Sequence, residues 1–345
     1  MAKPPIDIIL ALQGGGSHGA LAWGVIERFL VQPELRIAAI TGTSAGAMNG
    51  AMVAQGMAEG GADRAQKLLQ IFWAEIAKHS LLSPFQRTAQ DRATGDWSLD
   101  RNPAYVWFEL ITRIWSPYQG NPLNFNPLRD ILTEIIDLDR LNADDAPRLY
   151  ITATNVRTGQ PTLFTQPNLS IDAILASAAL PTLFHAVQID GEAYWDGGYT
   201  GNPALFPVVR DLPGRDLILV QTNPFERDPL PKTAPEIANR LNEITFNAAL
   251  LKELRVAVHA RERYGSGSST RLHRVLCDEV LTEYSPSSKL NGEGAYLKHL
   301  YDLGFQRAAD FLFEHGTSLG VKETFDPSSL FQDPNAPSDL LEAAE

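Results

Sequence analysis

Two serines of this 345-residue sequence stand between glycines in the pattern G-x-S-x-G. Ser17 lies in "GGGSHG" and Ser44 lies in "GTSAG", and each follows a short apolar run. This pattern is typical of a nucleophilic serine at a sharp strand-to-helix turn, where glycines leave room for the tight backbone and the hydroxyl is exposed. Both serines are therefore candidates for the attacking group of an acyl-transfer enzyme.

The first glycine run also fits the dinucleotide-binding pattern G-x-G-x-x-G, through Gly14, Gly16 and Gly19. A dinucleotide site needs a carboxylate at the end of the second strand, about 20 residues further on, to hold a ribose hydroxyl. Glu34 has about the right separation, but it precedes the expected second strand instead of ending it. The sequence therefore disfavours a nicotinamide or flavin site, and we expect no cofactor.

Acyl transfer also needs N–H donors for the oxyanion of the tetrahedral intermediate. A glycine run after a neighbouring strand can aim bare amides at that oxygen, and a helix that begins at Ser44 would favour the same negative charge. We therefore expect Ser44 to be the nucleophile, with Gly42 and Gly46 supporting its turn, and keep Ser17 as the alternative. The expected oxyanion donors are Gly14, Gly15 and Gly16.

A serine nucleophile needs a base. The motifs "GGGSHG", "GTSAG", "ASAALPTLF" (176–184) and "DGG" (196–198) occur here in the order seen in patatin-like phospholipases, which the sequence resembles from about Ile8 to Pro203. The resemblance implies a Ser-Asp dyad, with Ser44 as nucleophile and Asp196 as base. Many members of that family carry Arg or Lys in the glycine loop, where this sequence has His18. The remaining positions that the resemblance assigns to the support of the site are Gly197 and Gly198.

The resemblance implies a serine acyl hydrolase of the phospholipase, lipase or esterase type, which cleaves carboxylic ester bonds of lipids through an acyl-enzyme and needs no metal. Two alternatives stay open: a catalytically weak lipid-binding or regulatory protein on the same fold, and an esterase that acts on storage polyesters or small esters. The aromatic-rich segment from Phe72 to Phe125 is the candidate acyl groove. The candidates for substrate contact are His18, His185, Trp107 and Phe108.

Asp196 also has a structural interpretation, because Asp-Gly is an ordinary turn signal. The alternative to the dyad is a Ser-Asp-His triad in the chain order of α/β-hydrolases. The histidines that follow Asp196 and could complete such a triad are His259, His273, His299 and His315.

The elements that must position these residues follow an α/β pattern. A buried strand is predicted over 6–13 and a helix over 21–30, followed by a second strand, a turn and a helix that ends near Gly56. The fold class is therefore α/β, with a mainly parallel central sheet flanked by helices, and the family resemblance implies a three-layer architecture. A hairpin turn is predicted at Asp190 and Gly191. Further strands are predicted over 149–154, 162–165, 185–189 and 216–221.

We expect a catalytic domain over 6–225, with a helical, aromatic-rich insertion at about 57–130 and a sheet that continues to about Thr222. A C-terminal helical extension packed on the core is expected over 226–325. The acidic, proline-containing tail over 326–345 is expected to be weakly ordered. The predicted elements of the extension are a long helix over 237–258, a strand over 272–276 and a last helix over 295–315.

Composition restricts the classes of partner. The formal net charge of -12 argues against nucleic acid, because nucleic-acid affinity depends on neutralising phosphates with Lys and Arg. Cys277 is the single cysteine, so no intrachain disulfide forms and the cytoplasm is the expected location. No apolar stretch approaches the length of a membrane span, so contact with a membrane would be peripheral. The sequence does not determine the oligomeric state.

Overall fold

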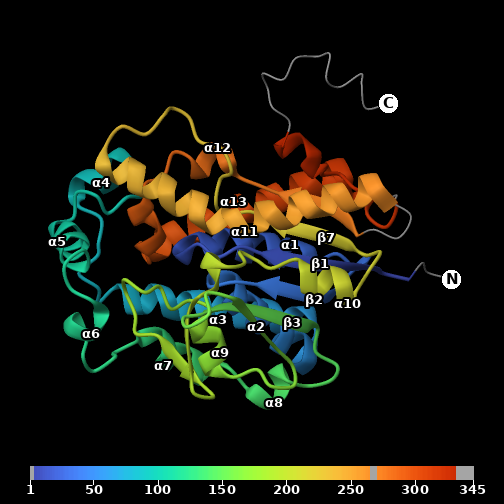
Figure 1. Cartoon of the computed structure of the whole chain (residues 1–345), viewed down its shortest axis with the longest axis horizontal. Coiled ribbons are helices and arrows are strands. Elements are labelled where there is room, and N and C mark those ends of the chain that lie inside the picture. The colour runs from blue at the N-terminus through green and yellow to red at the C-terminus, as the bar shows by residue number, and fades with distance from the viewer. Residues whose placement is uncertain (1–3, 265–269, 332–345) are drawn as a thin grey trace.

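An eight-stranded sheet forms the centre of the structure, a computed structural model that describes residues 4–264 and 270–331 (Figure 1). The central strand is β1 (Ile6–Leu12), which pairs in parallel with β2 (Leu35–Gly42) on one side and β7 (Asp216–Val220) on the other. The residues of β1 are buried on both faces from Ile8 onward, as its continuous apolar run predicts.

The other strands extend the sheet in both directions, in the order β5-β6-β3-β2-β1-β7-β8, with β4 paired to β3. Strand β3 is parallel to β2 and antiparallel to both β4 and β6. Strands β5 and β6 form a hairpin whose two loop residues, Asp190 and Gly191, both have positive φ, which confirms the predicted turn. The bounds of these strands are β3 (Arg148–Asn155), β4 (Pro161–Thr165), β5 (Val187–Ile189), β6 (Glu192–Asp196) and β8 (Arg271–Val275).

The sheet does not end near Thr222, as the sequence had suggested, because β8 adds to it in parallel beside β7. The expected strand near 272–276 is therefore part of the central sheet. Since β8 belongs to the segment expected as a C-terminal extension, that segment and the preceding domain share one sheet.

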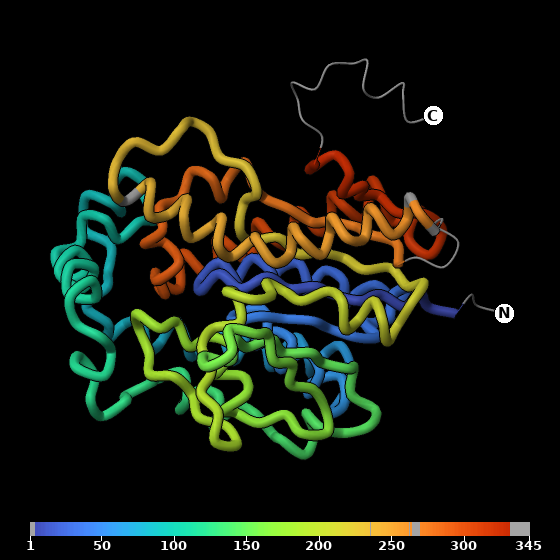
Figure 2. Tube along the Cα trace, in the orientation of Figure 1, coloured from blue at the N-terminus to red at the C-terminus, as the bar shows by residue number. Residues whose placement is uncertain are grey.

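Helices cover both faces of the sheet, which confirms the α/β fold class. One face packs against α1 (Gly19–Leu30), α2 (Ala45–Gly60), α3 (Ala62–Ser80) and α13 (Gly294–His315). The opposite face packs against α10 (Phe206–Asp211) and α11 (Ala234–Tyr264), the long helix that runs along the sheet in Figure 1. Figure 2 shows the first and last long helices side by side, although they are far apart in the sequence.

The helical insertion expected at 57–130 divides into two parts. Helix α3 belongs to the core, with Phe72 and Trp73 buried. Helices α4, α5 and α6 lie at one end of the molecule in Figure 1. The bounds of the remaining α-helices are α4 (Ala89–Thr94), α5 (Pro103–Thr112), α6 (Pro117–Gly120), α7 (Pro127–Ile135), α8 (Leu138–Leu141), α9 (Ile171–Ala176) and α12 (Asp278–Leu281).

Short 3₁₀ turns complete the chain. Part of the tail expected to be weakly ordered forms one of them, and Leu330 and Phe331 pack against the core on the α11 face. The rest of that tail, 332–345, and most of the glycine-serine break after α11 lie outside the described residues. No helix within the described ranges is both long and apolar enough to cross a membrane. The 3₁₀ turns are η1 (Gly16–His18), η2 (Gly197–Tyr199), η3 (Pro286–Leu290), η4 (Gly316–Ser318) and η5 (Pro327–Leu330).

Candidate active site

Ser44 lies at the sharp turn between β2 and α2, with φ of 55° and ψ of -124°. A non-glycine residue rarely adopts a positive φ, and strained residues of this kind cluster at functional sites. The turn is tight because the Gly46 amide donates to the Thr43 carbonyl at 2.9 Å, and a Cβ at Gly46 would overlap the carbonyl of Leu12. The predicted strand-turn-helix context of Ser44 is therefore present.

Asp196 ends β6 and begins η2, and it is 1% exposed. Its carboxyl accepts a hydrogen bond from the Gly198 amide at 2.7 Å. Burial raises the pKa of Asp196 to about 7, against hydrogen bonds from the Gly198 amide and the Ser44 hydroxyl that lower it. The Ser44 hydroxyl therefore lies close enough to Asp196 to lower the pKa of its carboxyl.

Ser177, in the segment "ASAALPTLF", hydrogen-bonds both to the backbone of Ser44 and to the backbone next to Asp196. Its hydroxyl donates to the Thr152 carbonyl at 2.6 Å and accepts a hydrogen bond from the Ser44 amide at 2.9 Å. Its own carbonyl accepts a hydrogen bond from the Gly197 amide at 3.2 Å, directly after Asp196. The sequence marked this segment only through the family resemblance and assigned no role to Ser177.

The glycine loop has fewer free amides than expected. The Gly14 amide donates to the side-chain oxygen of Asn202 at 2.7 Å, so it is not free to bind an oxyanion. The amides of Gly15, Gly16 and Ala45 have no acceptor among the residues of 4–264 and 270–331. Sequence analysis missed Ala45, although the residue after a nucleophilic serine commonly supplies one oxyanion donor.

Buried side-chain amides hold the glycine loop in place. Gln13, fully buried, donates to the Asn202 carbonyl at 3.2 Å and to the Asn247 side chain at 3.1 Å, and it accepts the Asn223 amide at 2.9 Å. The Asn223 side chain in turn donates to the Gly14 carbonyl at 2.6 Å. No local sequence pattern identified these amides, because their partners lie more than 180 residues away.

Ser44 borders a mainly apolar cavity of about 310 Å³. Phe72, Trp73 and Phe85 from the expected acyl groove line this cavity, together with Leu183. Ser17 also borders it, but the hydroxyl that influences the pKa of Asp196 is that of Ser44. A serine at the wall of an apolar cavity can attack the carbonyl of an ester whose acyl chain fills that cavity.

The two histidines proposed to contact substrate have other partners. His18 is buried, and its Nε2 lies 2.9 Å from the Ser288 hydroxyl. Burial and the charge of Lys289 lower the pKa of His18 to about 3, so the ring is neutral at neutral pH. His185 stacks on Tyr118, with ring centroids 4.0 Å apart. Neither histidine lines the cavity at Ser44.

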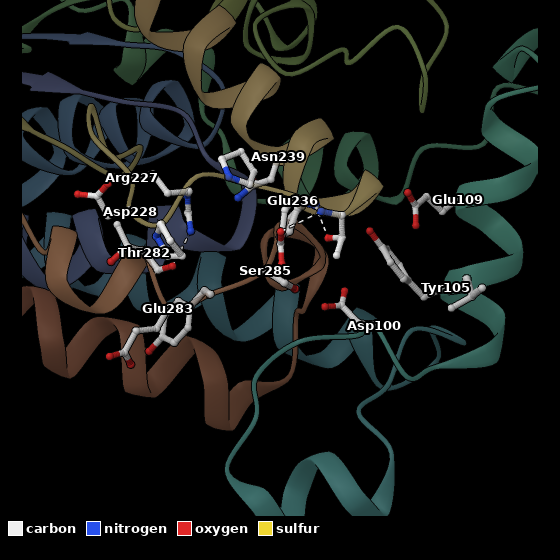
Figure 3. A pocket seen from close by; sticks show the side chains of 16 residues that line it. Asp100, Tyr105, Glu109, Arg227, Asp228, Glu236, Asn239, Thr282, Glu283 and Ser285 are labelled. Carbon is white, nitrogen blue, oxygen red and sulfur yellow. Dashed lines mark hydrogen bonds between the residues drawn. The ribbon is translucent and has the colours of Figure 1, made fainter.

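Two further cavities lie next to the cavity at Ser44. One of them, which we call the connecting cavity, has a volume of about 280 Å³ and shares Leu183 and Lys289 with the cavity at Ser44. Phe108, a predicted substrate contact, lines this connecting cavity. Trp107, also predicted to contact substrate, is exposed and lines neither of these two cavities. The connecting cavity shares Tyr105 with a larger cavity of about 600 Å³. Figure 3 shows the carboxylates around this larger cavity, which include Asp100, Glu109, Glu236 and Glu283.

The alternative triad does not form in this structure. His273 is buried in β8 and hydrogen-bonds to Asp216 at 2.9 Å, while His299 pairs with the Tyr284 hydroxyl at 2.8 Å. None of the four histidines that follow Asp196 in the sequence lines the cavity at Ser44. Among the described residues, no group of three or more His, Cys, Asp and Glu side chains could hold a metal ion.

Comparison with known proteins decides the family. A model of the patatin-like phospholipase family matches residues 10–209, which include Ser44 and Asp196. The chain belongs to the patatin-like phospholipase family. A cGAMP-activated phospholipase of Escherichia coli (strain TW11681) is 28% identical to it, over 61% of this chain and 58% of that protein. This patatin-like chain therefore spans less than two thirds of that relative's length.

Solved structures similar to this patatin-like chain include two bacterial proteins. VipD from Legionella pneumophila has a TM-score of 0.37 and 16% identity, over 90% of this chain and 67% of that chain. Full-length ExoU from Pseudomonas aeruginosa, solved in complex with SpcU, has a TM-score of 0.30 and 17% identity, over 87% of this chain and 53% of that chain.

Proposed function

We propose that this protein is a serine acyl hydrolase that cleaves carboxylic ester bonds of lipids through a Ser44-Asp196 dyad. The observation that supports this most directly is a strained serine at the wall of an apolar cavity, close enough to the buried carboxyl of Asp196 to influence its pKa. Membership of the patatin-like phospholipase family supports the same class of reaction.

In the proposed reaction, ionised Asp196 takes the proton of the Ser44 hydroxyl as its oxygen attacks the ester carbonyl carbon. The amides of Gly15, Gly16 and Ala45 bind the oxyanion that forms. The carbon–oxygen bond to the alcohol then breaks, and Asp196 returns the proton to the leaving alcohol. Water attacks the acyl-Ser44 ester in the same way and releases the fatty acid.

The pKa of Asp196 suits this role. A general base works best when its pKa lies near the working pH, and a value of about 7 meets that condition. The strength of the base comes from burial in the site and not from a nearby charge, since desolvation is the largest cause of the shift.

We further propose that the molecule contacts a lipid surface through its helical end. Large apolar side chains of the segment from α5 to the start of α7 point into solvent, with Trp107 65% exposed, Ile114 80% and Leu123 92%. Exposed clusters of apolar side chains mark interaction sites. A lipid surface can bury such side chains without a specific protein partner. We call this group the apolar rim; its members are Val106, Trp107, Leu110, Ile114, Trp115, Leu123 and Phe125.

Labelling with a fluorophosphonate probe, followed by peptide mapping, tests the proposed nucleophile. We expect the probe on Ser44 in the wild type and in Ser17→Ala, and no labelling in Ser44→Ala. Labelling of Ser17 alone would reverse the assignment, and absence of labelling would favour a lipid-binding protein without turnover.

Hydrolysis assays test the base and the substrate class. We expect Asp196→Asn to lower kcat at least about 100-fold, as expected for loss of a general base, while the folded state is retained. Phospholipid, triacylglycerol, polyester oligomer and short p-nitrophenyl esters should be assayed side by side. A folded Asp196→Asn variant with full activity would contradict the dyad, and activity confined to polyesters or short esters would contradict a lipid substrate.

A further inference from the structure

Lys289 lies against the glycine loop although it is far from that loop in the sequence. It belongs to η3, and its backbone packs so closely on Gly16 that a Cβ at Gly16 would overlap the Lys289 carbonyl. Gly16 also has φ of 58°, which favours glycine. Lys289 is therefore held directly beside one of the proposed oxyanion donors.

The ammonium group of Lys289 has only neutral partners. It donates to the side-chain oxygen of Asn223 at 2.9 Å and to that of Asn242 at 3.4 Å. Within residues 4–264 and 270–331 it forms no ion pair with a carboxylate. Glu243, the acidic group that influences its pKa most, pairs instead with Arg227 at 2.6 Å and with Arg240 at 3.2 Å. An ammonium has three N–H donors, so one donor and the full charge of Lys289 stay available to an anion.

Asn223 fixes this charge relative to the catalytic machinery. Its side-chain oxygen accepts from Lys289, and its side-chain nitrogen donates to the Gly14 carbonyl at 2.6 Å. One amide side chain thus joins the ammonium to the glycine loop, and a rigid link of this kind gives a bound anion a defined position relative to Ser44.

Lys289 also borders two neighbouring cavities. It lines both the apolar cavity at Ser44 and the connecting cavity, which share Leu183 as well. If the acyl chain fills the apolar cavity, the glycerol and its substituent face the connecting cavity. In a glycerophospholipid that substituent carries a phosphate only a few bonds from the scissile ester.

We propose that Lys289 binds the phosphate of a glycerophospholipid substrate and so selects phospholipids over neutral acyl esters. This inference rests on the proposed lipid hydrolase function. Burial lowers the pKa of Lys289 to about 8, a value at which most of the ammonium is charged at pH 7. A cation that is partly withdrawn from water and has no direct ion-pair partner gains from a phosphate partner.

The test compares a phosphatidylcholine with the diacylglycerol of the same acyl chains in the same mixed micelles. We expect Lys289→Met to lower the ratio of the two kcat/KM values at least tenfold, chiefly through KM for the phospholipid, and Lys289→Arg to restore part of it. The matched control is Lys298→Met, which removes an exposed lysine paired with Asp302 and should leave the ratio within twofold of wild type.

A ratio unchanged in a folded Lys289→Met variant overturns the proposal. If wild type hydrolyses neither lipid, the lipid hydrolase function fails instead, so the two failures are distinguishable. A measurement on the wild type covers the case in which the variant does not fold: glycerophosphocholine should inhibit hydrolysis of a p-nitrophenyl ester at least tenfold more strongly than glycerol or inorganic phosphate. Equal inhibition by glycerophosphocholine and glycerol, or by glycerophosphocholine and inorganic phosphate, also overturns the proposal.

Discussion

The carboxyl of Asp196 is almost fully buried beside Ser44, and burial raises its pKa from 3.8 to about 7. Because a general base must be ionised to accept a proton, the active fraction of the enzyme grows as the pH rises through this pKa. We therefore expect kcat/KM for a non-ionising ester to increase about tenfold per pH unit below 7 and to level off above it.

A pH profile from 5 to 9 measures this midpoint. Binding of an uncharged short ester does not depend on Lys289, so such a substrate isolates the titration of Asp196. A midpoint near 4, the usual range of an aspartate, would contradict our proposal that the buried Asp196 is the base.

Residue types and spacing were enough to indicate Ser44 and Asp196, because both stand in glycine-flanked motifs that share a family order. Residue types and spacing did not indicate that His18 lies outside the lining of the cavity at Ser44, or that Lys289 belongs to it. The proximity of His18 to the glycine run suggested substrate contact, but Ser288 of η3 holds its ring in the interior. No local sequence motif marks Lys289, because only the packing of η3 on Gly16 places it at the site.

At the scale of elements, α1, near the start of the sequence, packs closely on α13, which comes about 270 residues later. A Cβ at Gly24 would overlap the carbonyl of Tyr301, and one at Gly304 would overlap the carbonyl of Leu21. The Tyr301 hydroxyl also donates to Glu27 of α1 at 2.8 Å. Helix α13 is therefore part of the core that positions the glycine loop.

We expect Gly304→Ala to lower the free energy of unfolding by about 2 kcal/mol, because the added methyl group must push the two helix backbones apart. The matched control is Gly316→Ala, where a Cβ meets nothing within 4 Å, at the end of the same helix. Its effect should stay within about 0.5 kcal/mol. Urea unfolding of both variants measures the difference, and equal effects would show that α13 packs on α1 less closely than described.

The sequence predicted which segments form helices and strands more fully than it predicted which strands pair with one another. Apolar runs placed β1, β3 and β7 within one or two residues, since a buried strand needs a continuous apolar sequence. The place of β8 in the sheet could not be read from its sequence, because its partner β7 lies about 50 residues earlier and the pairing is set by tertiary packing.

For the whole molecule, the apolar rim and the net charge of -12 together determine which lipid surface is favoured. Apolar side chains gain free energy in any lipid interface, whereas an acidic protein is repelled by anionic head groups. We therefore expect stronger co-sedimentation with zwitterionic vesicles than with anionic vesicles of the same acyl composition at low salt.

The double variant Ile114→Glu, Leu123→Glu tests the apolar rim. It should lower the ratio of activity on vesicles to activity on a soluble short ester at least fivefold, because two apolar anchors become charged. The control is Phe313→Glu with Val321→Glu, which replaces two exposed apolar residues outside the rim. An equal fall in both double variants would mean that added negative charge, and not loss of the rim, weakens vesicle binding.

The close packing of α13 on α1 has a consequence for biosynthesis. The ribosome makes β1, the glycine loop and Ser44 before it makes β7, η3 and α13, which pack on or near them. A nascent chain that ends before β7 lacks one neighbour of its central strand, and a chain that ends before η3 lacks the segment that packs on Gly16. Because the glycine loop can take its final position only after these contacts form, we expect the proposed hydrolysis to begin only after η3 has been made.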